Sequence, residues 1–160
     1  ILVPRHLERF NRVKSLIDDQ GFNFSSRSKK EDVTNDVQVL LGDTMGELNF
    51  LYSVSDVAFV GGSLIDHGGQ NLLEPAAQGL PLCSGPSLRN FVEISNQLKK
   101  ASGLTIINNK KELADYFIDL IDDENNLQKT GQASKFIFME NRGAIGLIKK
   151  DLDSYINKVL

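Results

Sequence analysis

Three short segments of the chain combine residue types that can bind an anionic ligand. The first places a guanidinium beside an imidazole at Arg5-His6, and the second is the run GDTMGE at residues 42–47. The third, residues 61–75, has four glycines within its first nine residues and leads into a helix predicted at residues 72–78. Glycine lets a ligand approach the backbone closely, and backbone N–H groups before a helix bind phosphate. The third segment therefore favours ligand binding, whereas Arg5-His6 alone would be ordinary surface residues.

Each of the two later segments also has a structural explanation. Thr44 and Glu47 have the spacing of a capping box, in which two side chains satisfy backbone N–H groups of the first helical turn. Asn71 and Glu74 repeat the N-cap and N3 spacing at the end of the third segment. Neither segment is a GxGxxG or a Walker A sequence, which disfavours an ordinary dinucleotide-binding or P-loop NTPase site.

Other classes of function are disfavoured by composition and spacing. The net charge of −3 argues against a nucleic-acid-binding domain. Two histidines and one cysteine, far apart in the sequence, predict no metal cluster, and the absence of Gly-x-Ser-x-Gly leaves a hydrolase nucleophile unsupported. The single cysteine, Cys83, excludes an internal disulfide and is predicted to be a small core residue.

The elements that must position these segments alternate between strand and helix. A chain of 160 residues predicts one domain. Strands are predicted at residues 1–4, 22–26, 37–41, 57–60, 80–84 and 104–107, and helices at residues 6–20, 44–55, 72–78, 90–100, 111–122, 127–140 and 144–160. This order predicts an α/β fold, a Rossmann-like doubly wound parallel sheet with helices on both faces. Ligands bind such sheets at the carboxyl ends of the strands, where all three segments lie.

Several longer strings then resemble one enzyme family. They are GDTMGELNFLYSVSDVAFVGGSL, GGQNLLEPAAQGLP, SGP, NFVEI, the opening LVPRHLERF and the late NRGA, and they cover essentially the whole chain. In this order they closely resemble the 3-deoxy-D-manno-octulosonic acid (Kdo) transferases of lipopolysaccharide synthesis. The resemblance implies the C-terminal, donor-binding half of a GT-B glycosyltransferase, in which two doubly wound α/β domains enclose the active site.

For the full-length enzyme, the resemblance implies transfer of Kdo from CMP-Kdo to a lipid A precursor, with inversion and without a tightly bound metal or other cofactor. The catalytic base, the acceptor site and the membrane-associated surface belong to the N-terminal domain of that family. No catalytic residue is therefore expected in this chain, which alone should be inactive and soluble. Its expected partners are CMP-Kdo, its own N-terminal domain and, through that domain, a lipid A precursor. Its expected location is the cytoplasmic face of the bacterial inner membrane.

The family's donor-site motifs fall on the same three segments. Donor-binding residues are expected at Arg5, His6, Gly42, Thr44, Met45, Gly46, Glu47, Gly61, Gly62, Ser63, Gly68, Gly69, Gln70, Asn71 and Glu74. We expect Arg5 to neutralise the phosphate or the sugar carboxylate, and N–H groups near Gly46, Gly69 and Gln70 to hold the phosphate. Asn71 and Glu74 should contact the ribose hydroxyls or anchor their helix.

Two features depart from the family. Gln70 stands where the family commonly has His, although an amide can still donate a hydrogen bond. The family's donor half also begins with a further strand and helix, which this sequence lacks at its start. Two alternative functions are a GT-B donor domain for a UDP-sugar and a non-catalytic Rossmann-like module that binds a partner protein.

Overall fold

The computed structural model describes residues 1–30 and 32–143, so the helix predicted at 144–160 lies outside the described residues. The chain divides into two compact units, residues 1–55 and residues 56–160. Each unit is described by itself.

The first unit is built on two parallel strands, β1 (Phe24–Ser26) and β2 (Val39–Leu41). The strand predicted at residues 1–4 is reduced to one parallel bridge, between Leu2 and Leu41. Main-chain hydrogen bonds fix that bridge, since Leu2 N–H donates to the Leu40 carbonyl at 2.8 Å and Gly42 N–H donates to the Leu2 carbonyl at 2.9 Å. The unit also contains the helices α1 (Phe10–Asp19) and α2 (Leu48–Ser53) and the 3-10 turns Leu7–Arg9 and Arg27–Lys29.

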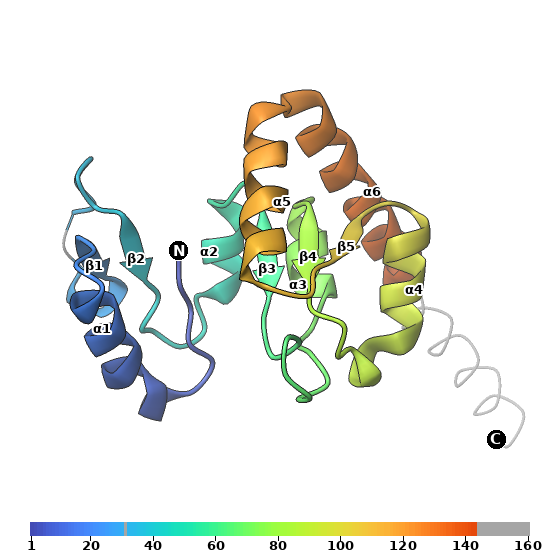
Figure 1. Cartoon of the computed structure of the whole chain (residues 1–160). Helices are drawn as coiled ribbons and strands as arrows, with labels where there is room; N and C mark the ends of the chain where they lie inside the picture. The colour runs from blue at the N-terminus through green and yellow to red at the C-terminus, as the bar shows by residue number, and fades with distance from the viewer. Residues whose placement is uncertain (31, 144–160) are drawn as a thin grey trace, which may run out of the picture. The chain divides into compact units, whose positions relative to one another are not determined.

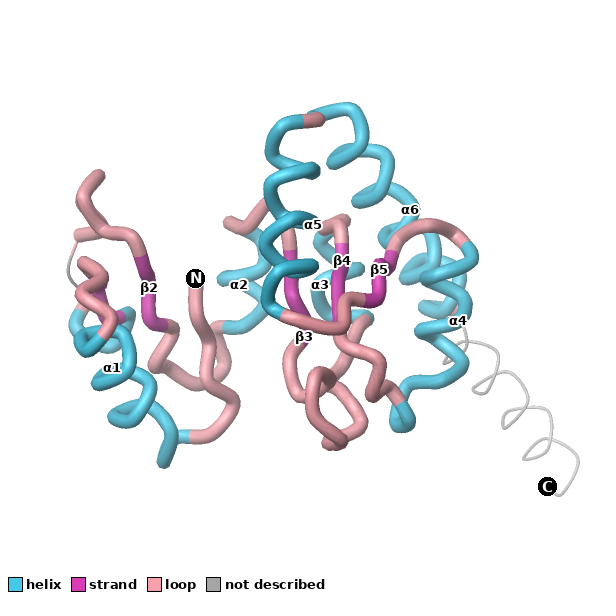
Figure 2. The backbone as a smooth tube through the Cα atoms, in the orientation of Figure 1, coloured by secondary structure: helices cyan, strands magenta, loops and turns pink. Residues whose placement is uncertain are grey.

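The second unit contains a three-stranded parallel sheet in the order β3-β4-β5. Its strands are β3 (Ala58–Val60), β4 (Leu82–Ser84) and β5 (Leu104–Ile106), and its helices are α3 (Leu73–Gln78), α4 (Val92–Lys100), α5 (Lys110–Asp122) and α6 (Glu124–Arg142), with a 3-10 turn at Arg89–Phe91. In Figure 1, α5 lies in front of the strands and α3 behind them. The loops that follow β3 and β4 gather at one end of the sheet (Figure 2).

The core of the second unit is apolar and closely packed. All three residues of β4 are fully buried. The helix α6 packs against β4 and against the segment before this strand. Ser134 Oγ donates to the Leu80 carbonyl at 2.6 Å, and a Cβ on Gly131 would lie 2.2 Å from the Gly79 carbonyl oxygen. Parallel sheets flanked by helices confirm the predicted α/β class. Over the described residues, none of the helices has the length and apolar character needed to span a membrane.

Most predicted elements are present but shorter than expected. The helix predicted from residue 44 begins only at Leu48, because Gly46 adopts a left-handed backbone conformation with φ of +80°. Helices do not continue through such a residue. The residues from 42 to 47 therefore form a loop rather than a helical turn.

Candidate functional site

Two of the three predicted segments lie at the carboxyl end of the first unit's sheet. Because Leu2 pairs in parallel with Leu41, the residues that follow each of them leave the sheet at this same end. Arg5 and His6 are both exposed there, and the His6 carbonyl begins the following 3-10 turn by accepting the Arg9 N–H at 3.0 Å. The residues after β1 reach this end as well, since β1 pairs in parallel with β2.

The loop at residues 42–47, here called the GDTMGE loop, is tied to the residues after β1 by an ion pair. Arg27 binds both carboxylate oxygens of Glu47, with Nε to Oε2 at 3.2 Å and Nη2 to Oε1 at 2.9 Å. Thr44 Oγ1 donates to Glu47 Oε2 at 2.5 Å. The predicted capping box is therefore wrong. The Glu47 side chain makes no hydrogen bond to a backbone N–H at the start of α2, and it accepts hydrogen bonds from Arg27 instead.

Electrostatics in this loop follow from these contacts. The hydrogen bond from Arg27, and then that from Thr44, hold the pKa of Glu47 below its usual range. Partial burial raises the pKa of Asp43, but hydrogen bonds from the Ser28 hydroxyl and N–H outweigh it and lower the pKa overall. These two bonds measure 2.6 and 2.8 Å. Both carboxylates are thus held in their ionised form.

The two glycines of the GDTMGE loop differ in what requires them. A Cβ on Gly42 would lie 2.8 Å from Leu51 Cδ1 and 3.0 Å from a Val3 methyl, so a side chain there would have to displace these two packed side chains. Gly46 is required by its positive φ, and no atom of the described chain lies within 4 Å of where its Cβ would be. The space above Gly46 is therefore open, and its neighbour Met45 is 63% exposed.

Ser63, the third residue of the third segment, is buried and links the end of β3 to the residue after β4. The Ser63 side chain is fully buried, and its hydroxyl donates to the Val60 carbonyl and accepts the Gly85 N–H, both at 2.8 Å. A Cβ on Gly85 would lie 2.3 Å from the Ser63 carbonyl oxygen. The Ser63 hydroxyl is thus used inside the protein, and a contact with a ligand could come only from its main chain.

Three of the four glycines in residues 61–71, the glycine loop, are needed by the fold itself. Gly62, Gly68 and Gly69 all have φ between +70° and +80°. Side chains fill the space beside each of them, and the nearest atom to an added Cβ is an amide of Gln70, an amide of Asn90 or a methyl of Leu88 respectively.

Gly61 is different from the other three. Its φ lies outside the left-handed range, and a Cβ would meet nothing within 4 Å among the described residues. Local structure therefore accounts for most of the glycine content that had favoured a ligand site, but it does not account for Gly61.

One predicted phosphate contact does not fit this geometry. The Gly69 N–H donates to the Gly62 carbonyl at 2.9 Å, so this group is already used within the loop. Gln70 is half-buried with its side chain against Gly62, and its backbone follows directly after the two left-handed glycines. Of the three N–H positions expected to hold a phosphate, those near Gly46 and Gln70 remain predictions.

Asn71 lies one position before the N-cap of α3, which is Leu72, and not at the N-cap as its spacing from Glu74 predicts. It still holds the start of this helix. Asn71 Oδ1 accepts the Leu73 N–H at 3.0 Å, and Asn71 Nδ2 donates to Glu74 Oε1 at 3.0 Å. The helix α3 that follows has only six residues, so its dipole is small. Any anion bound here would rely on loop N–H groups more than on the helix.

The structure adds residues that the sequence analysis missed. Arg27 and Ser28 hold the GDTMGE loop, and Ser87 contacts the glycine loop, accepting the Gly68 N–H at 3.0 Å. These partners lie 15 to 20 residues away in the sequence. Their polar side chains follow β1 and β4, and that placement at strand ends was the one signal that could have found them.

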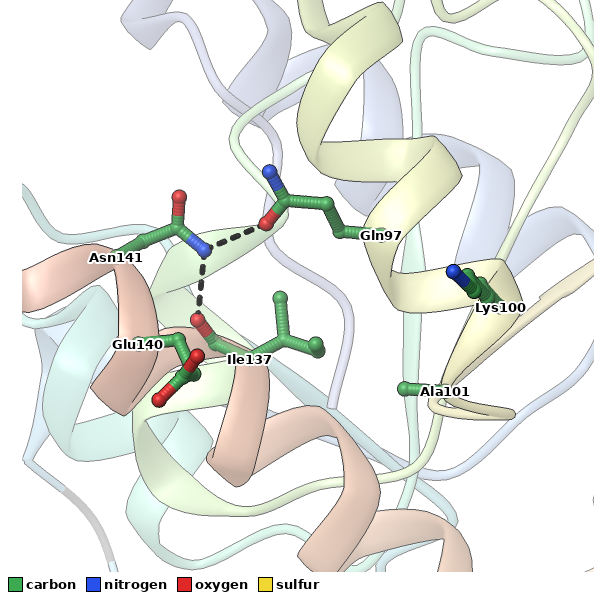
Figure 3. A pocket seen from close by; sticks show the side chains of 6 residues that line it. All are labelled: Gln97, Lys100, Ala101, Ile137, Glu140 and Asn141. Atoms are coloured by element: carbon green, nitrogen blue, oxygen red, sulfur yellow. Dashed lines mark hydrogen bonds between the residues drawn. The ribbon is translucent and has the colours of Figure 1, made fainter.

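A pocket of about 560 Å³ lies elsewhere, between α4 and α6 (Figure 3). It is lined by Gln97, Lys100, Ala101, Ile137, Glu140 and Asn141. Asn141 Nδ2 donates to both the Gln97 side chain and the Ile137 carbonyl at 2.8 Å, which joins the two helices. None of the three predicted segments contributes to this lining.

The single cysteine lies in the core of the second unit. Cys83 is fully buried, and burial raises the pKa of its thiol to about 12, which fits its predicted place in the core. Within residues 1–30 and 32–143, no three His, Cys, Asp or Glu side chains are grouped so that they could hold a metal ion.

The chain is similar to proteins of a known family. The profile of the family "Glycosyl transferases group 1" matches residues 11–136. The 3-deoxy-D-manno-octulosonic acid transferase of Haemophilus influenzae is 40% identical over 99% of this chain, and that of Bordetella pertussis is 32% identical over 90%. The matched regions cover 37% and 34% of those two relatives, so the chain spans about a third of their length.

A solved structure has the same fold. The crystal structure of the C-terminal CMP-Kdo binding domain of WaaA from Acinetobacter baumannii aligns with a TM-score of 0.80 and 29% identity, covering 84% of this chain and 72% of that one. This likeness confirms the predicted C-terminal half of a GT-B fold. The chain therefore belongs to the group 1 glycosyl transferases, and its resemblance to the donor-binding domain of the Kdo transferases is confirmed.

Proposed function

We propose that this chain binds CMP-Kdo as the donor-binding part of a Kdo transferase. The observation that carries the proposal is the likeness, at a TM-score of 0.80 and 29% identity, to a solved CMP-Kdo binding domain. The Kdo transferase relatives support it, because their similarity extends over 90% or more of the chain. The loops at the strand ends are consistent with it, since ligands bind parallel sheets there.

In the full-length enzyme, the acceptor hydroxyl of a lipid A precursor attacks the anomeric carbon of Kdo. The new carbon–oxygen bond forms as the bond to the CMP phosphate breaks, and the phosphate leaves with the bonding electrons. Attack from the face opposite to CMP inverts the anomeric centre. A carboxylate of the N-terminal domain takes the proton of the acceptor hydroxyl. CMP leaves without the help of a tightly bound metal. The N-terminal domain also brings the enzyme to the cytoplasmic face of the inner membrane.

This chain contributes positions that bind the donor. In the first unit, Arg5 neutralises the phosphate or the Kdo carboxylate, and the open space above Gly46 lets an anionic oxygen reach the backbone. Glu47 and Asp43 keep this loop in place, because their carboxylates are occupied by Arg27, Thr44 and Ser28. We assign these two carboxylates to the support of the loop rather than to the ligand.

In the second unit, the donor meets the glycine loop. Gly61 leaves space for close approach, and the backbone N–H and side-chain amide of Gln70 supply neutral hydrogen-bond donors. Asn71 holds one oxygen of Glu74, which leaves the second oxygen to accept a ribose hydroxyl. Catalysis is not expected from this chain alone, since all of these roles are binding roles.

Titration with CMP and with UDP tests the proposal. Amide signals of Gly46, Gly61 and Asn71 should shift with CMP, and CMP should bind at least about tenfold more tightly than UDP, a difference of about 1.4 kcal/mol. Arg5→Gln should weaken CMP binding about three- to tenfold, because it removes a charge-assisted contact. Arg9→Gln removes the same charge from the following turn and should leave binding unchanged.

Three results would count against the proposal. A preference for UDP would replace CMP-Kdo by a UDP-sugar as the donor. Absence of a response to either nucleotide would favour a module that binds a partner protein. Transfer of Kdo to a lipid A precursor by this chain alone would show that the catalytic base lies within these residues.

A further inference from the structure

The glycine loop is held in place by the segment that follows the neighbouring strand. β3 and β4 are parallel, with Val60 paired to Ser84, so the segments after them start side by side (Figure 2). The segment after β4, residues 85–90, donates two main-chain hydrogen bonds to the loop. Ser87 N–H donates to the Ser63 carbonyl at 3.0 Å, and Asn90 N–H donates to the Gly68 carbonyl at 3.3 Å.

The Ser87 hydroxyl lies at the centre of this contact. It accepts the Gly68 N–H at 3.0 Å and donates to Asp66 Oδ1 at 3.1 Å. Both hydrogen-bonding functions of the hydroxyl are thus used, and both act on the loop. Arg89 lies on the solvent side of this contact. It forms an ion pair with the Asp66 carboxylate and donates to the Asp66 main-chain carbonyl at 3.3 Å.

Burial separates the inner contact from the outer one. The Asp66 and Arg89 side chains are 84% and 58% exposed, and exposed ion pairs contribute little. Gly68 and Gly69, in contrast, are buried, and the places where their side chains would be are filled by residues 87–90. This side of the loop is therefore closed to a ligand, and residues 87–90 serve as its support.

We propose that Ser87 is a positioning residue for donor binding, which fixes the Gly68 backbone and thereby the left-handed path that leads to Gln70. The proposal rests on the proposed function of the glycine loop as the donor-binding loop. Without the Ser87 hydroxyl, the buried Gly68 N–H would lose its partner. An unpaired buried N–H is costly, so the loop would shift to expose it to water. Gln70, which is the next donor-binding residue along the chain, would shift with the loop.

The variants Ser87→Ala and Ser87→Thr test this role. Ser87→Ala removes the hydroxyl, whereas Ser87→Thr keeps it. The matched control is Ser95→Ala in α4, because Ser95 is also in the second unit and its hydroxyl donates only within its own helix, to the Val92 carbonyl at 2.9 Å. For each variant of the chain, CMP affinity, the hydrogen-exchange rate of the Gly68 amide and the melting temperature are measured.

We expect Ser87→Ala to weaken CMP binding about three- to tenfold, as loss of one part-buried hydrogen bond predicts. The Gly68 amide should exchange faster by a similar factor, while the melting temperature falls no further than in Ser95→Ala. Ser87→Thr should restore CMP affinity to within about twofold. A purely structural role would instead lower the melting temperature and leave CMP affinity unchanged.

Each outcome decides the matter. If wild-type protein binds CMP and Ser87→Ala binds it equally well, the positioning role is wrong while the proposed function stands. If Ser87→Thr is as weak as Ser87→Ala, the hydroxyl is not the group that matters. If wild-type protein does not bind CMP, the proposed function fails and this inference fails with it.

Discussion

The GDTMGE loop and the glycine loop each follow a parallel strand, but they are held in different ways. In the first, charged side chains make the ties, since Arg27 binds Glu47 and Asp43 accepts from Ser28. In the second, main-chain groups and neutral hydroxyls make them, through Ser63, Ser87 and the bond from Gly69 N–H to the Gly62 carbonyl.

This difference predicts different sensitivities. The Arg27–Glu47 pair has side chains that are 37% and 34% exposed, so salt and acid can weaken it. In the glycine loop, the bonds made by Ser63 Oγ and by the Gly69 N–H involve no charged group. Its ion pair, Asp66 with Arg89, is largely exposed. Gly68 and Gly69 leave little room for added atoms. The GDTMGE loop should therefore respond to charge and pH, and the glycine loop to steric changes.

The largest expected effect is that of Gly85→Ala. Its Cβ would lie 2.3 Å from the Ser63 carbonyl oxygen, and the main chain would have to move. We expect the free energy of unfolding to fall by about 3 kcal/mol, the upper range for overpacking. Gly46→Ala, in the GDTMGE loop, meets open space and should cost only the left-handed strain of about 1 kcal/mol. Equal losses in the two variants, measured by urea unfolding, would contradict the comparison.

Arg27→Met should have the next largest effect, and it should be local. The substitution keeps much of the apolar stem over Phe50, where the guanidinium now lies 5.3 Å from the ring centroid, but removes both bonds to Glu47. We expect the Gly46 amide signal to move and CMP affinity to fall about threefold. Arg89→Met removes a more exposed pair and should change stability by less than about 0.5 kcal/mol. The account is weakened if Arg89→Met disturbs its loop more than Arg27→Met disturbs the GDTMGE loop.

Acid should loosen the GDTMGE loop before the glycine loop. Because the pKa of Glu47 is lowered in the folded protein, the folded state binds fewer protons than the unfolded state in acid. The stabilisation is therefore complete above the ordinary Glu pKa of about 4.5 and is lost as the pH falls below it. Amide chemical shifts followed from pH 7 towards about 3 should change first at Gly46 and later at Gly69, whose N–H is bonded to a main-chain carbonyl. The opposite order would show that the charged ties do not hold the first loop.

The sequence predicted the fold well where the signal is local. Short apolar runs predicted both ends of β1 to β5 to within two residues, and the alternation of strand and helix predicted their parallel order. The strand predicted at residues 1–4 is the least accurate of the six, because these residues form only one bridge, between Leu2 and Leu41.

The candidate site was predicted in part, because its ties are long-range. Thr44 and Glu47 have capping-box spacing, but spacing cannot reveal that Arg27, 20 positions away, competes for the carboxylate. The number of glycines in the third segment was a poor indicator of a ligand site, because most of them are required by the local backbone. Gly62, Gly68 and Gly69 serve the fold, and only φ and neighbouring atoms can distinguish them from Gly61.

The central claim is that the loop after β3 binds the donor nucleotide, and Gly61→Ala tests it most directly. Because the added methyl meets no described atom and needs no unusual φ, stability should be unchanged or rise by up to about 1 kcal/mol. A donor that approaches the Gly61 backbone would meet this methyl, so calorimetric titration should show CMP affinity reduced about tenfold, or about 1.4 kcal/mol. Wild-type affinity for CMP in a stable Gly61→Ala protein would contradict the claim.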